Sequence, residues 1–255
     1  TVTGVAIFIA RLFDIITDPI IGILSDKTDG YIPKKWGRRK PLILLGGILG
    51  VVGTIFLLNP ETGASAFYLT IWTTVLYLGW TMISIPYLAW GADLSDNYDE
   101  RTNITSVREF FMLAGIMLAG AIPALASTNG YDEQQSMSLI GWVMIGFGLV
   151  LFCVLLFGVK ETTIPKFHKK EKPLSAIKGI FGNRSFRLLV VVWTINGIAN
   201  GIPAALFILY LKYALKADEL ERGLLTFAYF LAAVLGIPLW LKLSKNFDKH
   251  KVWIM

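Results

Sequence analysis

Three ionisable residues, Arg11, Asp14 and Asp18, interrupt the apolar sequence near the start of the chain. On a helix, spacings of about three and four residues place them on one face, and Thr17 lies beside them. A charged side chain inside a bilayer is costly unless it is paired or hydrated, so such residues are usually functional. Two carboxylates and a hydroxyl are hard oxygen ligands that suit Na⁺ or a transferable proton. The alternative is a buried Arg11–Asp14 ion pair that only holds helices together.

A second apolar stretch carries Thr81, Ser84, Pro86 and Tyr87. Proline removes one helical hydrogen bond, so the carbonyl of Met82 is released and a bent helix can present it to a ligand. The alternative is a simple kink whose Ser and Thr side chains pack between helices. We treat Thr81 as a candidate cation ligand and Ser84 and Tyr87 as candidate solute ligands.

Three further polar residues lie in or near later apolar stretches. Arg108 either extends to the cytoplasmic surface or points into a cavity and donates hydrogen bonds to a solute. Asn196 and Asn200 lie one helical turn apart among Gly and Pro residues. Asparagines in this setting more often join helices than bind ligands, but we retain both as candidate solute ligands.

Long apolar stretches must position these residues. Of the 255 residues, 55% are hydrophobic and 16% are charged, against about 25% charged in a soluble protein. Seven stretches approach the ~20 residues that cross a bilayer: residues 3–24, 41–58, 66–92, 106–126, 138–159, 186–212 and 220–242. The sequence therefore predicts an all-α polytopic membrane protein.

Little in the sequence is suited to catalysis or to holding a metal. Cys153 is the one cysteine and lies in an apolar stretch, while His168 and His250 lie far apart in basic segments. These residues make no internal disulfide, nucleophile–base pair or metal cluster. We expect a protein that is not an enzyme, with no cofactor and no metal beyond a transported cation.

Loops that are rich in Lys and Arg alternate along the chain with loops that contain none. Residues 25–40 hold six and residues 160–187 hold eight, whereas residues 59–65 and 127–137 hold none. Because basic loops resist translocation, we expect segments 25–40, 93–106 and 160–185 to be cytoplasmic. This topology accounts for the net charge of +6. We exclude a nucleic-acid partner because the aromatic residues lie in the apolar stretches and not among the basic ones.

The long basic segment divides the chain. We expect an N-terminal half at 1–159, a cytoplasmic linker at 160–185 and the start of a C-terminal half at 186–255. The charge bias makes the first visible span run from outside to inside, so a cytoplasmic N-terminus requires one span before it. We therefore expect a piece of a longer carrier with two parallel repeats.

The motifs resemble a known family. Residues 22–27 followed by 37–39, Gly-Ile-Leu-Ser-Asp-Lys and Gly-Arg-Arg, resemble the loop signature of the major facilitator superfamily. Residues 11–22 resemble helix 2 of the glycoside–pentoside–hexuronide:cation symporters, the family of melibiose permease. Residues 85–87, 91–95, 99–102 and 108–115 resemble its helix 4, the following loop and helix 5. The resemblance implies an incomplete major facilitator fold, with helices 2 to 8 and the start of helix 9.

The resemblance also assigns roles to residues. It implies a cation site made by Asp14, Thr17, Asp18 and Thr81, and it places a sugar-binding arginine at Arg108. With the residues above, our candidate solute ligands are Arg11, Ser84, Tyr87, Arg108, Asn196 and Asn200. Thr17 stands where melibiose permease has Asn, and Ser84 and Leu88 stand where it has a sugar-binding Asp and a Trp. The coupling ion, Na⁺ or H⁺, and the solute therefore stay open.

Loop charge and the resemblance together predict a cytoplasmic gate between helices. We expect Asp26, Arg38, Arg39, Asp99 and Arg101 to cluster there. Charge changes in this cluster should alter the transport rate more than solute affinity.

The expected function is cation-coupled symport of a sugar-like solute by alternating access, in the cell (inner or plasma) membrane. The expected partners are the solute, the coupling cation and membrane lipid. One rival is a carrier of a lysolipid or a drug on the same scaffold, which an apolar wall at Leu88 would favour. A non-transporting membrane enzyme is the other rival, and it lacks the catalytic groups it would need.

Overall fold

The structure is a computed structural model that describes residues 2–27, 36–60, 63–161, 182–217, 219–247 and 251. These residues form helices and no strands, which confirms the all-α prediction. The long helices are α1 (Val2–Lys27), α3 (Lys40–Leu58), α4 (Ala66–Asp93), α5 (Tyr98–Thr128), α6 (Glu133–Cys153), α8 (Arg184–Leu209) and α9 (Glu219–Asn246). Two of them continue into short π-helices, α6 into η1 (Val154–Gly158) and α8 into η2 (Tyr210–Ala214).

Each predicted span corresponds to one helix. Among the described residues, six helical segments are long and apolar enough to cross a membrane. The remaining predicted span is α1, a helix of 26 residues that carries Arg11, Asp14 and Asp18 within its length. The first helix thus combines a spanning length with the candidate cation ligands.

The start of α5 differs from the prediction. Asn97 caps the helix, because its Oδ1 accepts hydrogen bonds from the backbone N–H of Asp99 at 2.8 Å and of Glu100 at 3.3 Å. An asparagine at this position stabilises a helix N-terminus. Residues 98–105, expected before the helix, are therefore helical.

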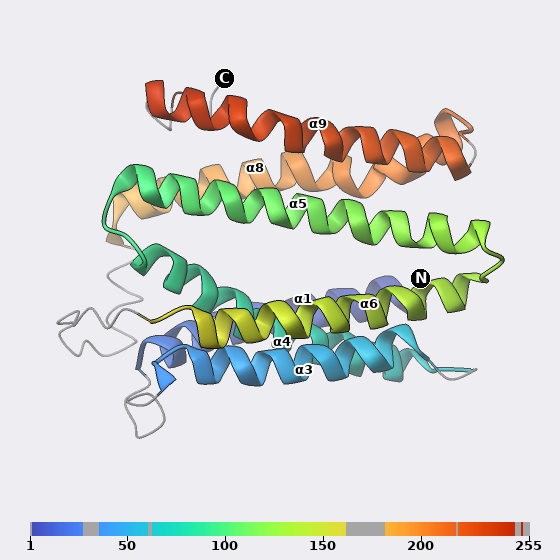
Figure 1. Ribbon diagram of the computed structural model, residues 1–255, viewed down its shortest axis with the longest axis horizontal. Coiled ribbons are helices and arrows are strands. Elements are labelled where there is room, and N and C mark those ends of the chain that lie inside the picture. Colours follow the sequence, from blue (N-terminus) through green and yellow to red (C-terminus); the bar gives the residue numbers. More distant parts are fainter. Residues whose placement is uncertain are drawn as a thin grey trace. The chain divides into compact units, whose positions relative to one another are not determined.

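The chain divides into two compact units, Thr1–Thr163 with Leu231–Met255, and Ile164–Phe230. In the first unit α4 packs against both α1 and α3, and α6 packs against α3 and α5 (Figure 1). The α3 and α4 backbones approach closely at glycines: a Cβ on Gly46 would lie 2.8 Å from the carbonyl oxygen of Gly79. Small residues permit such close packing between membrane helices.

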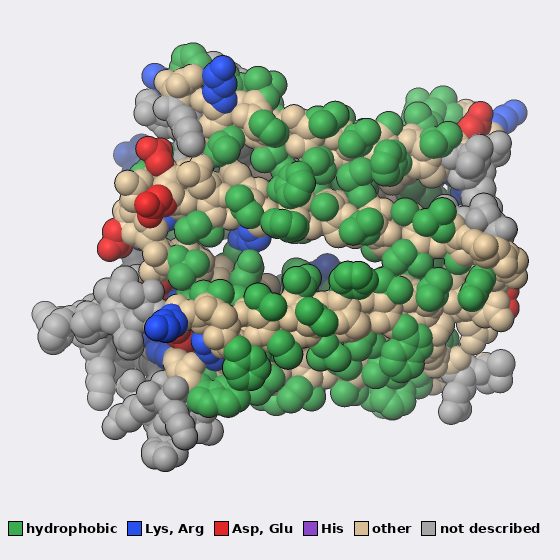
Figure 2. All heavy atoms as spheres, in the orientation of Figure 1, with side chains coloured by type: hydrophobic (Ala, Val, Ile, Leu, Met, Phe, Trp, Pro, Cys, Tyr) green, Lys and Arg blue, Asp and Glu red, His purple; other side chains and the backbone are tan. Residues whose placement is uncertain are grey.

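The buried core of the first unit is small. One cluster joins α1, α3 and α4 through Ile21, Leu42 and Met82. Another joins α3, α4 and η1 and consists of Ile43, Trp90 and Leu156. Most large apolar side chains are exposed instead, and Figure 2 shows them covering the outer faces of α3 and α6. This distribution fits helices whose outer faces contact lipid.

The second unit contains α8, η2 and the first part of α9. Asn183 caps α8 by accepting from the backbone N–H of Ser185 at 3.0 Å. The rings of Phe207 and Tyr229 lie 5.7 Å apart and join α8 to α9. Most of the predicted linker, residues 162–181, and the predicted start of a further helix at 252–255 lie outside the described residues.

Candidate functional site

Two candidate cation ligands meet where α1 packs against α4. The Thr81 hydroxyl donates a hydrogen bond to Oδ1 of Asp18 at 3.0 Å, although the two residues are 63 positions apart in the sequence. Thr81 is only 4% exposed, whereas Asp18 is exposed, so a buried hydroxyl on α4 donates to an exposed carboxylate on α1. The packing of α1 on α4 therefore brings together a carboxylate and a hydroxyl that the sequence had assigned to one site.

Asp14 lies one turn before Asp18 on α1, with its side chain 14% exposed. One of its oxygens, Oδ2, lies 3.5 Å from Nη1 of Arg11. The other, Oδ1, is buried and has no hydrogen-bond partner among the described residues. A buried carboxylate oxygen without a partner is costly, and a bound cation or proton would remove that cost.

Thr17 and Arg11 are the other two candidate site residues on α1. Thr17 is buried, and its hydroxyl donates to the backbone carbonyl of Phe13 at 3.2 Å, which leaves its oxygen able to accept or to bind a cation. The guanidinium of Arg11 lies 4.2 Å from the ring centroid of Tyr77. Tyr77 was not predicted as part of the site. It lies one turn before Thr81 on α4, and that shared face is the signal that would have found it.

A cavity of about 1070 Å³ lies between α5 and α6 and reaches the end of α4. Figure 2 shows it as an open gap between α5 and α6. Its polar lining residues are Tyr87, Asn103 and Arg108, and apolar side chains such as Phe111 and Phe147 form most of the remaining wall. Arg108 therefore lines the cavity, where it also pairs with its neighbour Glu109.

The other candidate solute ligands are placed differently. Ser84 is half-buried on α4 and is not among the residues that line this cavity. Asn196 and Asn200 lie in the second unit, where the Asn200 amide donates to the backbone carbonyl of Asn196 at 2.8 Å and to its Oδ1 at 3.1 Å. Both hydrogen bonds lie within α8 and join residues one helical turn apart.

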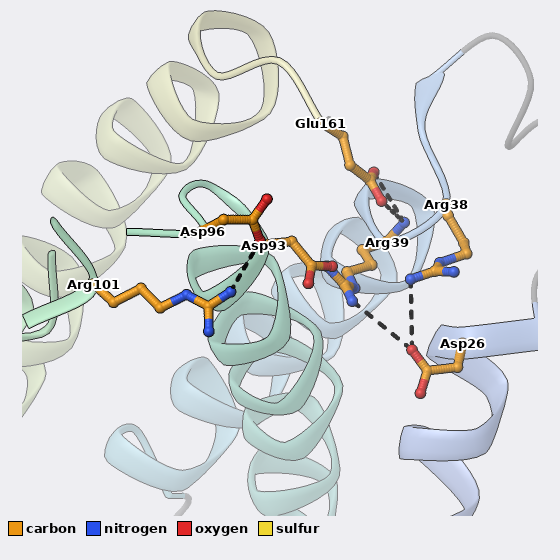
Figure 3. Close-up of polar contacts among 7 residues, drawn as sticks. All are labelled: Asp26, Arg38, Arg39, Asp93, Asp96, Arg101 and Glu161. Atoms are coloured by element: carbon orange, nitrogen blue, oxygen red, sulfur yellow. Dashed lines mark hydrogen bonds and ion pairs between the residues drawn. The ribbon is translucent and has the colours of Figure 1, made fainter. Parts of the chain in front are cut away.

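A charged cluster lies where α1 and α4 end and α3 begins (Figure 3). Arg39 is buried, and its Nη1 lies 2.7 Å from Oδ2 of Asp93, while its Nη2 lies 3.8 Å from Oδ1 of Asp26. Arg38 pairs with the same Asp26 oxygen at 3.5 Å. We call Asp26, Arg38, Arg39 and Asp93 the Arg39 cluster. Three of them were predicted gate residues, whereas Asp93 was not assigned a role.

The remaining predicted gate residues make local contacts. Arg101 pairs with Asp96 at 3.4 Å, and its Nε donates to the backbone carbonyl of Ser95 at 2.6 Å. Asp99 lies in the first turn of α5. Among the described residues, neither Arg101 nor Asp99 forms an ion pair with a member of the Arg39 cluster.

Glu161, like Tyr77 and Asp93, was not predicted from the sequence. The backbone N–H of Arg39 donates to both carboxylate oxygens of Glu161, at 3.1 and 3.2 Å, and Figure 3 shows the two side by side. The sequence feature that could have identified Glu161 is its position, as a single acid between the end of an apolar stretch and a long basic segment.

A family model described as MFS/sugar transport protein matches residues 1–255. The chain belongs to this family. It is 28% identical to the uncharacterized symporter YnaJ of Bacillus subtilis (strain 168), over 86% of its own length and 48% of that relative. It is 24% identical to the putative glycoside/cation symporter YagG of Escherichia coli (strain K12), over 97% of its length and 54% of that relative.

A relative with a different named cargo also matches. The chain is 25% identical to the sodium-dependent lysophosphatidylcholine symporter 1-A of Danio rerio, over 93% of its length and 51% of that relative. The chain spans about half the length of the curated relatives it matches. Family membership and the membrane-length helices confirm the incomplete major facilitator fold, the resemblance to cation symporters and the multi-pass membrane location.

Proposed function

We propose that the complete protein is a secondary active transporter that couples Na⁺ or H⁺ to the uptake of a sugar-like solute. The contact between Thr81 and Asp18 beside Asp14 carries this proposal. It provides two carboxylates and a hydroxyl from two helices, with one buried carboxylate oxygen unpartnered within the described chain. The names of two relatives, a glycoside/cation symporter and a sodium-dependent symporter, support a coupling ion.

We propose that ion binding acts on the carrier through the contact between α1 and α4. A cation at this contact neutralises the carboxylates of α1 and binds to oxygens of both α1 and α4. It therefore strengthens the attachment of the two helices in the state that binds it. If that state also binds solute more tightly, ion and solute each strengthen the binding of the other by the same factor.

The cavity supplies a solute site. Arg108 and Tyr87 offer hydrogen-bond donors at its polar part, and a solute with several hydroxyl groups would satisfy them. A glycoside also presents apolar ring faces and an aglycone, which the remaining wall can contact. We propose these two residues as solute ligands.

A lysolipid is the second candidate solute. The wall of the cavity is mostly apolar along α5 and α6, which suits an acyl chain, and one relative is named for lysophosphatidylcholine. We favour the sugar-like solute because the family description and the YagG name refer to sugar or glycoside. Both candidates are transported cargo, and we propose a carrier rather than an enzyme.

Uptake by the full-length protein in proteoliposomes tests the proposal. The probes are radiolabelled methyl glycosides of glucose, galactose and xylose, and lysophosphatidylcholine, each with a Na⁺ gradient, with a pH gradient or with neither. We expect uphill uptake of one glycoside that depends on one of the two gradients. Uphill uptake of lysophosphatidylcholine alone would favour the second candidate, and gradient-independent equilibration of every probe would contradict coupled transport.

A further inference from the structure

The Arg11 guanidinium has one partner on α1 and another on α4. Its Nη1 lies 3.5 Å from Oδ2 of Asp14, and its Cζ lies 4.2 Å from the ring centroid of Tyr77. A guanidinium that fully engages a carboxylate lies about 2.7–2.9 Å from it and often binds both of its oxygens. The 2.7 Å contact between Arg39 and Asp93 has such a distance. The pairing of Arg11 with Asp14 is therefore loose and involves only one oxygen.

The contact with the Tyr77 ring is close by comparison. A cation is attracted to the face of an aromatic ring when it lies within about 6 Å of the centroid, and arginine makes such contacts more often than lysine. The sequence of α4 offers Arg11 no carboxylate at this level, because the one charged residue of the helix is Asp93 at its C-terminal end. The half-buried ring of Tyr77 is therefore the group on α4 that holds the guanidinium.

Two contacts between α1 and α4 lie on either side of Asp14 along α1. Arg11 meets Tyr77 before it, and Asp18 meets Thr81 after it. Because Tyr77 and Thr81 are one turn apart on α4, the ring and the hydroxyl face the same stretch of α1. Between these contacts, Oδ1 of Asp14 is buried and has no hydrogen-bond partner in the described part of the chain. The guanidinium at the ring does not take up that oxygen.

We infer that Tyr77 is a positioning residue for the coupling cation: it keeps the Arg11 guanidinium over its ring and so leaves the Asp14 carboxylate available to the ion. The inference rests on the proposed transport function, in which Asp14 and Asp18 bind that ion. Arg11 and the ion compete for one carboxylate. A partner that stabilises Arg11 away from Asp14 therefore raises the fraction of the protein that is competent to bind the ion.

An ion-binding measurement that needs no solute tests this inference. The thermal unfolding midpoint of the purified full-length protein is measured against Na⁺ at fixed pH, with K⁺ keeping the ionic strength constant, and against pH without Na⁺. A bound ion raises this midpoint by mass action, so the Na⁺ concentration or the pH that gives half of the maximal rise reports ion affinity.

Tyr77→Leu removes the ring, so Arg11 is expected to occupy Asp14 more fully and the ion to bind less tightly. The half-maximal Na⁺ concentration should rise about three- to tenfold, or the half-maximal pH should fall by about 0.5 to 1 unit. This range lies between the effects of exposed and of desolvated contacts between a cation and a ring. If Tyr77→Leu does not accumulate, Tyr77→Met replaces it, with the same expected shift.

Two single variants control for the loss of an aromatic side chain. Tyr77→Phe keeps the ring face, so its ion affinity should stay within about twofold of wild type. Trp80→Leu removes another ring from α4, one residue before Thr81, but Trp80 is 62% exposed. Trp80→Leu should therefore leave the half-maximal Na⁺ concentration and pH unchanged.

A double variant separates an effect through Arg11 from a general change in packing. In an Arg11→Gln background the ring has no guanidinium to hold, so Tyr77→Leu should change ion affinity by less than about twofold. A loss of packing alone would lower the unfolding midpoint at every Na⁺ concentration and pH without moving the half-maximal point.

Each outcome decides the inference. Unchanged or tighter ion binding in Tyr77→Leu, an equal shift in Tyr77→Phe or Trp80→Leu, or the same shift in the Arg11→Gln background would overturn it. A wild-type protein that neither Na⁺ nor pH stabilises would overturn the inference together with the cation site. Failure of the proposed transport alone gives a different result, in which the ion stabilises the protein but no probe is taken up against its gradient, and the Tyr77 variants still decide the inference.

Discussion

The α1–α4 contact and the Arg39 cluster are both built from carboxylates and arginines, but their charges balance differently. At the α1–α4 contact there are two carboxylates, Asp14 and Asp18, and one arginine, Arg11, which pairs with Asp14 and has a side chain that is 62% exposed. In the Arg39 cluster, two arginines meet Asp26 and Asp93, and the adjoining Lys40 and Glu161 add one charge of each sign.

The difference indicates what each region does. The α1–α4 contact has an excess of one negative charge among its described residues, which one Na⁺ or one proton would neutralise. The Arg39 cluster needs no external ion because its charges cancel within the protein. A group of charges that is complete without a ligand is suited to hold helices together, and an incomplete group is suited to bind and release one.

Asp18→Asn would make the first region resemble the second, because it removes the excess charge and keeps the shape of the side chain. We expect uphill, ion-coupled accumulation of the glycoside probe to be lost, a decrease in the range of about 5- to 150-fold set by typical coupling energies. Probe binding should persist and become independent of Na⁺ and pH. Uptake and equilibrium binding in proteoliposomes measure both.

Asp96→Asn is the matched control for this change. Asp96 has a side chain that is 92% exposed, and it pairs with Arg101 outside the Arg39 cluster, so accumulation should stay near wild type. If Asp18→Asn still concentrates the probe with wild-type ion dependence, Asp18 is structural and the charge argument for the site is wrong.

Arg39→Ala breaks the balance of the second region. Its side chain is 5% exposed, so removal leaves Asp93 without its guanidinium and should destabilise the carrier by about 3 kcal/mol. Turnover should fall while the Na⁺ or H⁺ dependence stays unchanged.

Asp26→Asn is the comparison variant. It removes the 58% exposed partner of the same arginine and should lower the free energy of unfolding by less than about 1 kcal/mol. Thermal unfolding and initial uptake rates distinguish the two, and equal costs would show that burial does not decide the effect.

Thr81→Val tests whether the first region depends on the hydroxyl as well as on charge. Valine keeps the shape but removes the hydrogen bond to Asp18, so the ion concentration for half-maximal uptake should rise about five- to tenfold. Thr81→Ser retains a hydroxyl and should stay within about threefold of wild type. A titration of uptake against Na⁺ and against pH measures the shift. Equal values for the Val and Ser variants would exclude the hydroxyl as a ligand.

The sequence predicted the helices well because each apolar stretch can be assigned without knowledge of its neighbours. It also placed Asp14, Asp18 and Thr17 on one helix face, since helical periodicity alone determines that. The start of α5 was missed by eight residues because Asn97, a short-range cap, was not recognised. These successes and the error all concern contacts within one segment.

Partners from distant segments could not be predicted in this way. Glu161 meets the Arg39 amide across 122 positions, and nothing in either segment specifies the other. Arg101 was expected in the gate because of its charge, but Asp96 and the Ser95 carbonyl are nearer along the chain. Charge identified the kind of contact, and helix packing determined which residues make it.

Arg11→Gln is the finest test of the comparison, because it increases the charge imbalance instead of removing it. Arg11 lies 3.5 Å from Asp14 and is mostly exposed, so its attraction for the carboxylates is weak, in the range of surface ion pairs. Without it, the excess negative charge at the α1–α4 contact rises by one. The coupling cation should then bind about two- to fivefold more tightly, seen as a lower Na⁺ concentration or a higher pH for half-maximal uptake.

Arg11→Lys is the control for this variant. It keeps the charge and should leave the Na⁺ concentration and the pH for half-maximal uptake unchanged. Weaker cation binding in Arg11→Gln would mean that Arg11 positions Asp14 for the ion and does not compete with it, and the charge count would then have to be abandoned as the basis of the site.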